Sequence, residues 1–320
     1  MPRTDLILNL AKAGSQGDQV GVRRTLEAIV ADEREKQHHV VADRLSEVLS
    51  LTQTNGAGPS AADGGASPLL EVLPRRSLRD MVLPTVVRQA IEELTEEQHR
   101  ADLLRSHSLE PRNRILVVGE PGNGKTSLAE ALAGELAVPL LVVRYEAVIG
   151  SYLGETALRL ARLFERVRAR RCVLFFDEFD TIGKERGDKH ETGEIKRVVS
   201  SLLLNVDALP SYVVTVAATN HAELLDRAIW RRFQVRLELP RPGQADILEW
   251  LRRFELGLGE PLGLATRATA ATLKGLSFAE LDELCGDVQR RVVLAGPDSD
   301  LRKIVRARLA QWRARTAVRR

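Results

Sequence analysis

The feature that most constrains the fold is a glycine-rich loop between an apolar run and a helix-forming segment. It reads Gly119-Glu120-Pro121-Gly122-Asn123-Gly124-Lys125-Thr126 and fits the pattern G-x-x-x-x-G-K-[ST]. Glycines let backbone N–H groups close around phosphates, Lys125 can reach the outer phosphate oxygens, and the Thr126 hydroxyl can bind Mg²⁺. The sequence therefore predicts a phosphate-binding loop that extends from Gly119 to Ser127.

Five short apolar runs alternate with helical segments after Leu69. They are Arg114 to Val118, Val138 to Val143, Cys172 to Phe176, Tyr212 to Thr219 and Gln234 to Leu239. Runs of this kind are typical of buried parallel strands, and alternation with helices predicts a doubly wound, five-stranded parallel α/β sheet. In such sheets the nucleotide binds at the carboxyl ends of the strands.

The pattern also predicts the domain boundaries. Residues 1–51 carry helical apolar spacing and predict a small N-terminal helical domain, followed by a flexible linker over 52–68 that is rich in Gly, Ala and Ser. Residues 69–240 form the α/β domain, and 241–320 form an all-helical domain in which the strand pattern stops.

Length and composition exclude several classes of protein. A chain of 320 residues with 44% hydrophobic content can bury a core, and it contains no run of about 18 apolar residues that could span a membrane. Its start lacks a basic stretch followed by an apolar one, so we expect a cytoplasmic protein without a membrane partner. Cys172 and Cys285 have neither disulfide nor metal-ligand spacing and are expected to be buried small hydrophobes.

The positive charge gathers at the C-terminus. Residues 300–320 carry a net +7, which leaves −4 for the rest of a chain whose formal charge is +3. Apolar residues recur there at helical spacing, which predicts an amphipathic helix with arginines on its outer face. A solvated face is the favoured interpretation, and nucleic acid or an acidic protein is the alternative.

Two carboxylates follow the third apolar run. This run, Cys172 to Phe176, places Asp177 and Glu178 at the end of a buried strand, beside the phosphate-binding loop. We expect Asp177 to hold Mg²⁺ together with Thr126, and Glu178 to be the general base that orients the attacking water.

Three further residues are candidates for catalysis. Asn220 follows the fourth run and is a candidate sensor of the γ-phosphate, or else a turn-favouring residue. Arg231 and Arg232 precede the fifth run and are either solvated charges or fingers that reach the γ-phosphate of a neighbouring subunit.

An aromatic residue stands in the loop after the second run. Only 4% of the residues are aromatic, so an aromatic side chain in a loop that is otherwise suited to solvent is informative. This residue is Tyr152, and Leu153 and Gly154 follow it. Tyr152 either staples the loop to the protein or lines a channel that grips an extended polypeptide.

Together these segments resemble the AAA family of ATPases over about Leu69 to Val293. The glycine-rich loop is similar to Walker A, residues Phe175–Glu178 resemble Walker B, and Ala218–Asn220 resemble sensor 1. Residues Leu225–Phe233 resemble the arginine-finger region of the katanin and spastin group, and Ser151–Thr156 resemble the pore loop. Gly193 to Arg197 resembles a second pore-facing segment, and Gly275 to Leu281 resembles a step of the helical lid. Departures are Phe278 in place of a small Gly and Gln234-Val235 in place of an acidic pair.

The resemblance implies an ATPase that uses ATP and Mg²⁺ in a homo-oligomeric ring, expected to be a hexamer. Such a motor unfolds, translocates or remodels a protein substrate, and bacterial members can pair with a subtilisin-like protease, of which this chain has no motif. A DNA-directed AAA protein and an ATP-gated scaffold remain as alternatives, although nucleic acid is not the expected partner.

Overall fold

The computed structural model describes residues 67–148, 153–180, 192–258, 264–296 and 300–317, together with residues 25 and 28–30. The chain divides into two units, residues 1–66 and Ser67–Arg320. In the first unit, residues 28–30 are helical, and Ile29 and Val30 are buried. The predicted N-terminal domain and linker otherwise lie outside the described residues, so those boundaries stay predictions. The description below concerns the second unit.

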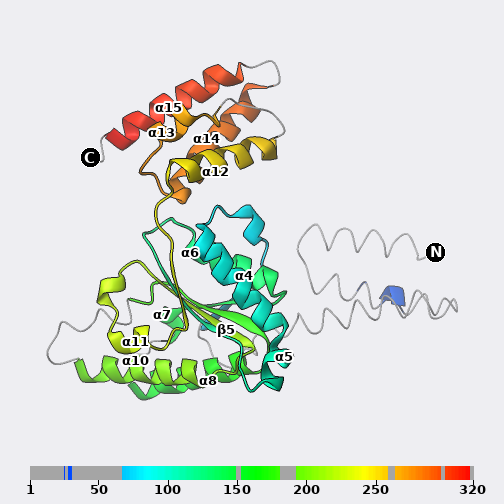
Figure 1. The fold of residues 1–320 in the computed structure, drawn as a ribbon, viewed down its shortest axis with the longest axis vertical. Helices are drawn as coiled ribbons and strands as arrows, with labels where there is room; N and C mark the ends of the chain where they lie inside the picture. The colour runs from blue at the N-terminus through cyan, green and yellow to red at the C-terminus, as the bar shows by residue number, and fades with distance from the viewer. Residues whose placement is uncertain are drawn as a thin grey trace. The chain divides into compact units, whose positions relative to one another are not determined.

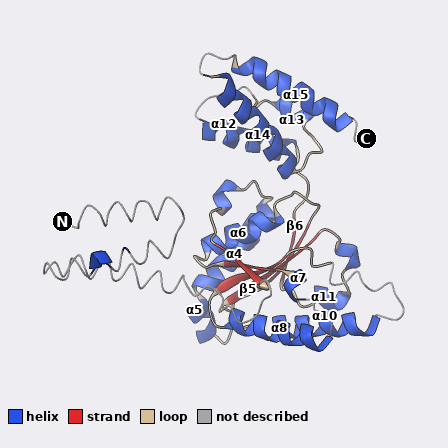
Figure 2. Cartoon of the chain, turned by 180° about the vertical axis from the view of Figure 1, so that it is seen from behind, coloured by secondary structure: helices blue, strands red, loops and turns tan. Residues whose placement is uncertain are grey.

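A six-stranded sheet forms the centre of this unit (Figures 1 and 2). Its strand order is β1-β3-β4-β5-β2-β6, and all neighbours pair in parallel except β1 with β3. The strands are β1 (Leu69–Val72), β2 (Arg114–Val118), β3 (Leu140–Val143), β4 (Cys172–Phe176), β5 (Val213–Thr219) and β6 (Val235–Glu238). The central strands β4 and β5 are buried along their whole length, as continuous apolar runs predict.

Helices cover both faces of the sheet (Figure 1). On one face α4 (Thr85–His99) and α6 (Lys125–Glu135) pack on alternate strand residues that include Val173 and Phe175. On the other face α8 (Leu153–Arg168) and α10 (Thr192–Asp207) pack on residues that include Leu174 and Phe176. The shorter elements are η1 (Leu78–Asp80), α5 (Ala101–Ser106), α7 (Tyr145–Val148), η2 (Ala222–Leu224) and α11 (Arg227–Trp230).

All five predicted strands are present, and the doubly wound α/β class is confirmed. The sixth strand, β1, was not predicted. It is four residues long, and Leu70 is half exposed, so it lacks the long apolar run that marks the buried strands. It joins the sheet as an antiparallel edge beside β3, with Leu69 opposite Val143.

Gln234 explains one departure from the family pattern. Its side-chain oxygen accepts hydrogen bonds from the backbone N–H groups of Asn113 at 3.0 Å and Arg114 at 3.1 Å. The amide of Asn113 in turn donates to the carbonyls of Pro210 and Val213. Gln234 therefore satisfies the backbone N–H groups where β2 begins. An amide oxygen is sufficient for this, so the acidic residue of the family pattern is not needed here.

The remaining helices form a separate small core, shown above the sheet in Figure 1. They are α12 (Gln244–Leu258), α13 (Arg267–Thr272), α14 (Phe278–Ala295) and α15 (Leu301–Ala317). Ser277 and Glu280 make a capping box that starts α14. In α15, Val305 and Trp312 are buried while Arg302, Lys303 and Arg306 are exposed, as the amphipathic pattern predicts.

Both cysteines are buried and free, as expected. Burial raises the pKa of the Cys172 thiol to about 11 and raises that of Cys285 further. Within the described ranges, no helix has the length and apolar character needed to cross a membrane.

Candidate functional site

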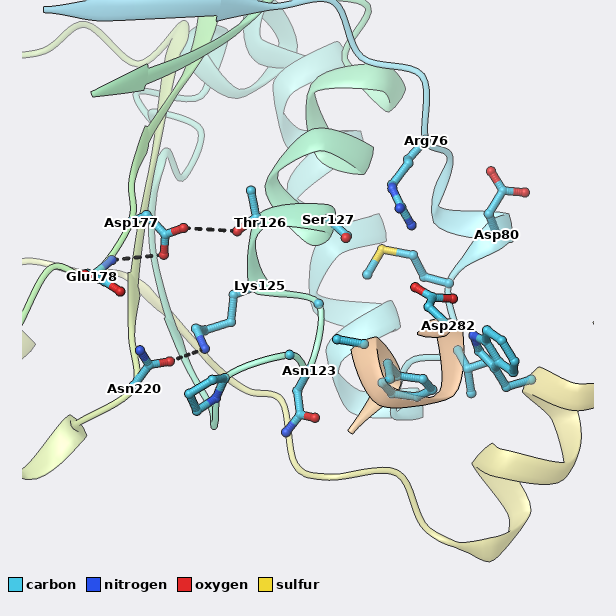
Figure 3. A pocket seen from close by; sticks show the side chains of 18 residues that line it. Arg76, Asp80, Asn123, Lys125, Thr126, Ser127, Asp177, Glu178, Asn220 and Asp282 are labelled. Atoms are coloured by element: carbon cyan, nitrogen blue, oxygen red, sulfur yellow. Dashed lines mark hydrogen bonds between the residues drawn. The ribbon is translucent and has the colours of Figure 1, made fainter. Parts of the chain in front are cut away.

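A cavity of about 360 Å³ opens where the carboxyl ends of β2, β4 and β5 meet (Figure 3). The residues that line one end follow these strands and come from the phosphate-binding loop, the Asp177-Glu178 pair and Asn220. The other end is lined by residues before α4 and by residues of the C-terminal helices. Three of the segments predicted to carry chemistry, the phosphate-binding loop, the Asp177-Glu178 pair and Asn220, thus converge on one cavity.

The glycines of the loop are required for two different reasons. Gly122 and Gly124 have φ of +78° and +88°, which favour residues without a Cβ, and Gly124 is the N-cap of α6. Gly119 allows a close approach, because a Cβ there would lie 2.4 Å from the carbonyl oxygen of Leu239. The loop leads into the N-terminus of an 11-residue helix, which is a favourable place for an anion.

Lys125 points into the cavity and is almost wholly buried. Its Nζ donates hydrogen bonds to the carbonyl oxygens of Gly119 at 2.7 Å and Glu120 at 3.1 Å, and to Oδ1 of Asn220 at 2.5 Å. Burial lowers the pKa of Lys125, and the negative charges of Asp177, Asp180 and Glu178 oppose that shift. The three ammonium protons therefore have weak neutral partners that phosphate oxygens can replace.

Thr126 and Asp177 lie together as a metal site requires. The Thr126 hydroxyl donates to Oδ2 of Asp177 at 3.2 Å, and Oδ1 of Asp177 accepts from the backbone N–H of Glu178 at 2.9 Å. Among the described residues, no group of three or more His, Cys, Asp or Glu could hold a metal ion. Two oxygen ligands beside a phosphate cradle fit Mg²⁺, which keeps several waters and binds substrate phosphates.

Buried polar atoms give an independent sign that the loop is built for a ligand. Asn123 is buried, yet within the described parts of the chain its amide nitrogen and oxygen both lack a hydrogen-bond partner. Buried polar groups are rarely left this way in a native protein unless a ligand or water completes them. The loop therefore fits a bound polyphosphate.

Glu178 is exposed and stands in a strained backbone conformation. Its φ is +47°, in the left-handed region that costs a non-glycine residue about 1 kcal/mol or more. Such strain gathers at functional sites, and here it turns the carboxylate out of the end of β4 toward the cavity that it lines.

Two buried residues near this carboxylate were missed by the sequence analysis. Oδ1 of Asp180 accepts a hydrogen bond from the Thr219 hydroxyl at 2.9 Å, and that hydroxyl accepts from the backbone N–H of His221 at 3.0 Å. The pair links the segment after β4 to the end of β5, which presents Asn220. The position of Asp180, two residues after Glu178, was the only sequence signal.

Most residues at the end of the cavity away from the phosphate-binding loop were also missed. The exceptions are Phe278 and Ala279, which belong to the Gly275 to Leu281 segment. This end is lined by Arg76, Asp80, Met81, Val82, Trp250, Phe278, Ala279 and Asp282. Phe278 was noted as a departure from the family pattern, and the structure places it in the wall of the cavity. These residues come from segments far apart in the chain, so their convergence had no local signal.

The C-terminal helices contact the phosphate-binding loop directly. The backbone N–H of Ala279 donates to the carbonyl oxygen of Gly122 at 3.0 Å. Arg241 donates through Nε to the Glu120 carboxylate at 2.6 Å and through a terminal nitrogen to the carbonyl oxygen of Gly275 at 2.7 Å. A change in the loop on nucleotide binding can therefore be passed to the helical domain.

The structure separates the two predicted arginine fingers by their surroundings. Arg232 makes an ion pair with Asp207 at the end of α10, and Asp207 also accepts from Arg114 at 2.7 Å. Arg231 is exposed, and the described residues offer it no ion pair. Neither arginine lines the cavity of its own chain.

The predicted pore segments cannot be placed in the same way. Tyr152 lies outside the described residues, and Leu153 and Gly154 begin α8 with side chains that are not described. Residues 193–197 lie at the start of α10, again without described side chains.

Residues 115–241 match the profile of the ATPase family associated with various cellular activities (AAA). An uncharacterized AAA family ATPase of Sinorhizobium fredii is 35% identical over 303 residues, which cover 92% of this chain and 90% of the relative. The peroxisomal ATPase pex6 of Schizosaccharomyces pombe is 37% identical over 46% of this chain and 15% of its own length. The ATP-dependent zinc metalloprotease FtsH 3 of Sphaerobacter thermophilus is 34% identical over 58% of this chain and 39% of its own length.

Proposed function

Because the chain belongs to the AAA family of ATPases and hydrolyses ATP, we propose that it works as a ring of identical subunits that remodels a protein substrate. Unfolding or translocation of that substrate, a hexameric ring and delivery to a separate protease are the finer parts of the proposal. The observation that supports it best is the incomplete phosphate end of the cavity. Among the described residues that line this end, Lys125 is the one cation, while Arg231 is exposed elsewhere on the surface.

The residues of the cavity have separate roles in the proposed reaction. Lys125 leaves Asn220 to bind the outer phosphates, and Asn220 then contacts the γ-phosphate or the attacking water. Glu178 accepts a proton from that water and orients it. Thr126 and Asp177 would hold Mg²⁺, which neutralises charge on the phosphates when it is bound.

In this proposal one of the two arginines completes the site of a neighbouring subunit. Arg231 is the residue that reaches the neighbour's γ-phosphate, where it stabilises charge in the transition state. Arg232 has an intramolecular partner in Asp207, so its first role is to hold the end of α11 against α10. The two adjacent arginines therefore differ in function.

Action on proteins is supported by the relatives and by the predicted pore loop. FtsH 3 is a protease by its printed name, and proteins are the substrates of proteases. Tyr152 would grip the substrate in the central channel, and residues 1–51 would select it.

A mixing experiment tests the shared site. We expect Lys125→Ala to abolish nucleotide binding and Arg231→Ala to abolish hydrolysis but not binding, whereas a mixture of the two regains activity at interfaces with both groups intact. Arg227→Ala, which removes an exposed arginine from α11, the short helix that ends just before Arg231, is the matched control and should retain activity. Hydrolysis that is independent of protein concentration and of Arg231 would exclude the shared site.

A second measurement tests the substrate class. Unfolded casein should stimulate ATP hydrolysis by the wild type, and Tyr152→Ala should lose this stimulation while its basal rate is retained. Stimulation by double-stranded DNA instead of casein, with salt-sensitive binding, would replace the protein substrate by nucleic acid.

A further inference from the structure

Tyr145 stands beside the Asp177-Glu178 pair but has no part in the mechanism above. It begins α7 two residues after the end of β3, at Val143, and β3 pairs in parallel with β4 so that Val142 lies opposite Phe175. Its ring packs on the core cluster that contains Phe176. The sheet therefore delivers Tyr145 and Glu178 to the same edge from neighbouring strands.

The Tyr145 hydroxyl is buried and makes no hydrogen bond to any of the described residues. A buried hydroxyl without a partner destabilises the folded protein, and a phenylalanine of the same shape would avoid that cost. Tyr212 is 37% exposed, and its hydroxyl is nevertheless paired, because it donates to the carbonyl oxygen of Arg168 at 2.7 Å. The Tyr145 hydroxyl thus does not stabilise the nucleotide-free protein.

The surroundings of this hydroxyl are acidic. Burial raises the pKa of Tyr145 well above its usual value, and the negative charges of Asp177, Asp180 and Glu178 raise it further. The group consequently stays protonated and can act only as a neutral donor toward carboxylates. A hydrogen bond from a neutral donor to a carboxylate is among the stronger kinds in a protein.

Two of these three carboxylates already have defined tasks. Both oxygens of Asp177 accept hydrogen bonds, from Thr126 and from the N–H of Glu178, and Asp180 is buried against Thr219. Glu178 is exposed on a strained backbone, and its carboxylate must point at the attacking water for hydrolysis to occur. Orientation of this one side chain is the step that an additional donor can improve.

We propose that Tyr145 is a positioning residue whose hydroxyl donates to the Glu178 carboxylate when nucleotide is bound and holds it toward the attacking water. The proposal rests on the role of Glu178 as the general base. It assigns the buried hydroxyl to the working state of the enzyme and not to the stability of the resting state.

The test compares Tyr145→Phe with Tyr212→Phe in the full-length chain. We expect Tyr145→Phe to lower kcat by about tenfold with KM for ATP within about twofold, and to leave the melting temperature of the nucleotide-free protein unchanged or raised. Tyr212→Phe should do the opposite, with a lower melting temperature and an unchanged kcat, because it loses a hydrogen bond between two residues that do not line the cavity. Both variants retain ring shape and volume.

Two results would overturn the proposal. Wild-type kcat in Tyr145→Phe shows that the hydroxyl does not assist hydrolysis, and a lower melting temperature without a change in kcat shows a structural role. Glu178→Gln separates these outcomes from a failure of the proposed reaction, since it should bind ATP and not hydrolyse it. If Glu178→Gln hydrolyses ATP normally, the base assignment itself is wrong.

Discussion

Lys125 donates a hydrogen bond to Asn220 in the cavity, with 2.5 Å between Nζ and Oδ1 (Figure 3). One residue comes from the loop after β2 and the other from the end of β5, and these strands pair directly. Lys125, which we expect to bind phosphate, is therefore paired with Asn220, which we expect to sense the γ-phosphate. We expect nucleotide binding to break this contact, which would link occupancy of the loop to the position of β5.

The first prediction concerns this contact. Asn220→Ala should lower kcat by roughly tenfold to a hundredfold, because it removes a polar group beside the reacting phosphate, while the Kd for ADP changes by less than about threefold. Steady-state hydrolysis and fluorescence titration with labelled ADP measure the two quantities. Asn205→Ala, which removes an amide from the surface of α10, is the control. A large loss of ADP affinity would assign Asn220 to ground-state binding.

The second prediction compares two glycines of the same φ. Gly122 and Gly296 have φ of +78° and +79°, so alanine strains the backbone at both, by about 1–3 kcal/mol. Only at Gly122 does the new Cβ also meet Ser277, 2.9 Å from its Oγ, at the contact between the loop and the C-terminal helices.

Gly122→Ala should therefore abolish ATP binding, while Gly296→Ala should lower the melting temperature and keep the affinity for ATP. Calorimetric titration and thermal unfolding distinguish the two effects. Equal losses of affinity in both variants would show that general destabilisation, and not the local contact, controls binding.

The sequence predicted the parts of the protein that depend on local order. The glycine pattern, the apolar runs and the polar residues that follow them lie close together in the chain, and parallel pairing brings their ends to one edge. The residues that line the phosphate end of the cavity, from Pro121 to Asn220, are therefore all among the predicted site residues, while their roles stay predictions.

The parts that were missed depend on contacts between distant segments. Arg76 and Trp250 both line the end of the cavity away from the phosphate-binding loop, although more than half of the chain separates them in the sequence. No spacing rule connects them. The ion pair that distinguishes Arg232 from Arg231 needs Asp207, whose position relative to α11 is set by packing of α10 on the sheet. Such tertiary contacts are not visible in periodicity.

The third prediction tests that ion pair. Asp207→Asn should release Arg232 and Arg114 from their shared partner, which is about a third exposed, so the loss of stability should be modest. Because the end of α11 then moves more freely, we expect hydrolysis in the assembled protein to fall by severalfold. Asp102→Asn, which removes a fully exposed partner of Arg105, should change neither quantity. Unchanged hydrolysis would show that Arg232 needs no anchor.

The last prediction is a pH dependence that comes from Glu97 and Arg112. The carboxylate of Glu97 accepts from the backbone N–H of Arg112 at 2.9 Å and from its guanidinium at 2.8 Å, which ties α4 to the segment before β2. Burial alone would raise the pKa of Glu97, but the hydrogen bonds and charge of Arg112 outweigh it and lower the pKa below 4.5. The stabilisation is therefore complete above the usual glutamate range and is lost as the pH falls through the lowered pKa.

Glu97→Gln should consequently destabilise the protein by about 1 kcal/mol at pH 7, after allowance for solvent screening, and the difference should shrink steadily below about pH 4. Urea unfolding of both proteins across this range measures it. Glu93→Gln is the matched control, because Glu93 lies 3.5 Å from the same guanidinium and is half exposed, so its effect should be small at every pH. A difference between Glu97→Gln and the wild type that stays constant down to pH 3 would mean that packing, and not the charge of Glu97, stabilises this contact.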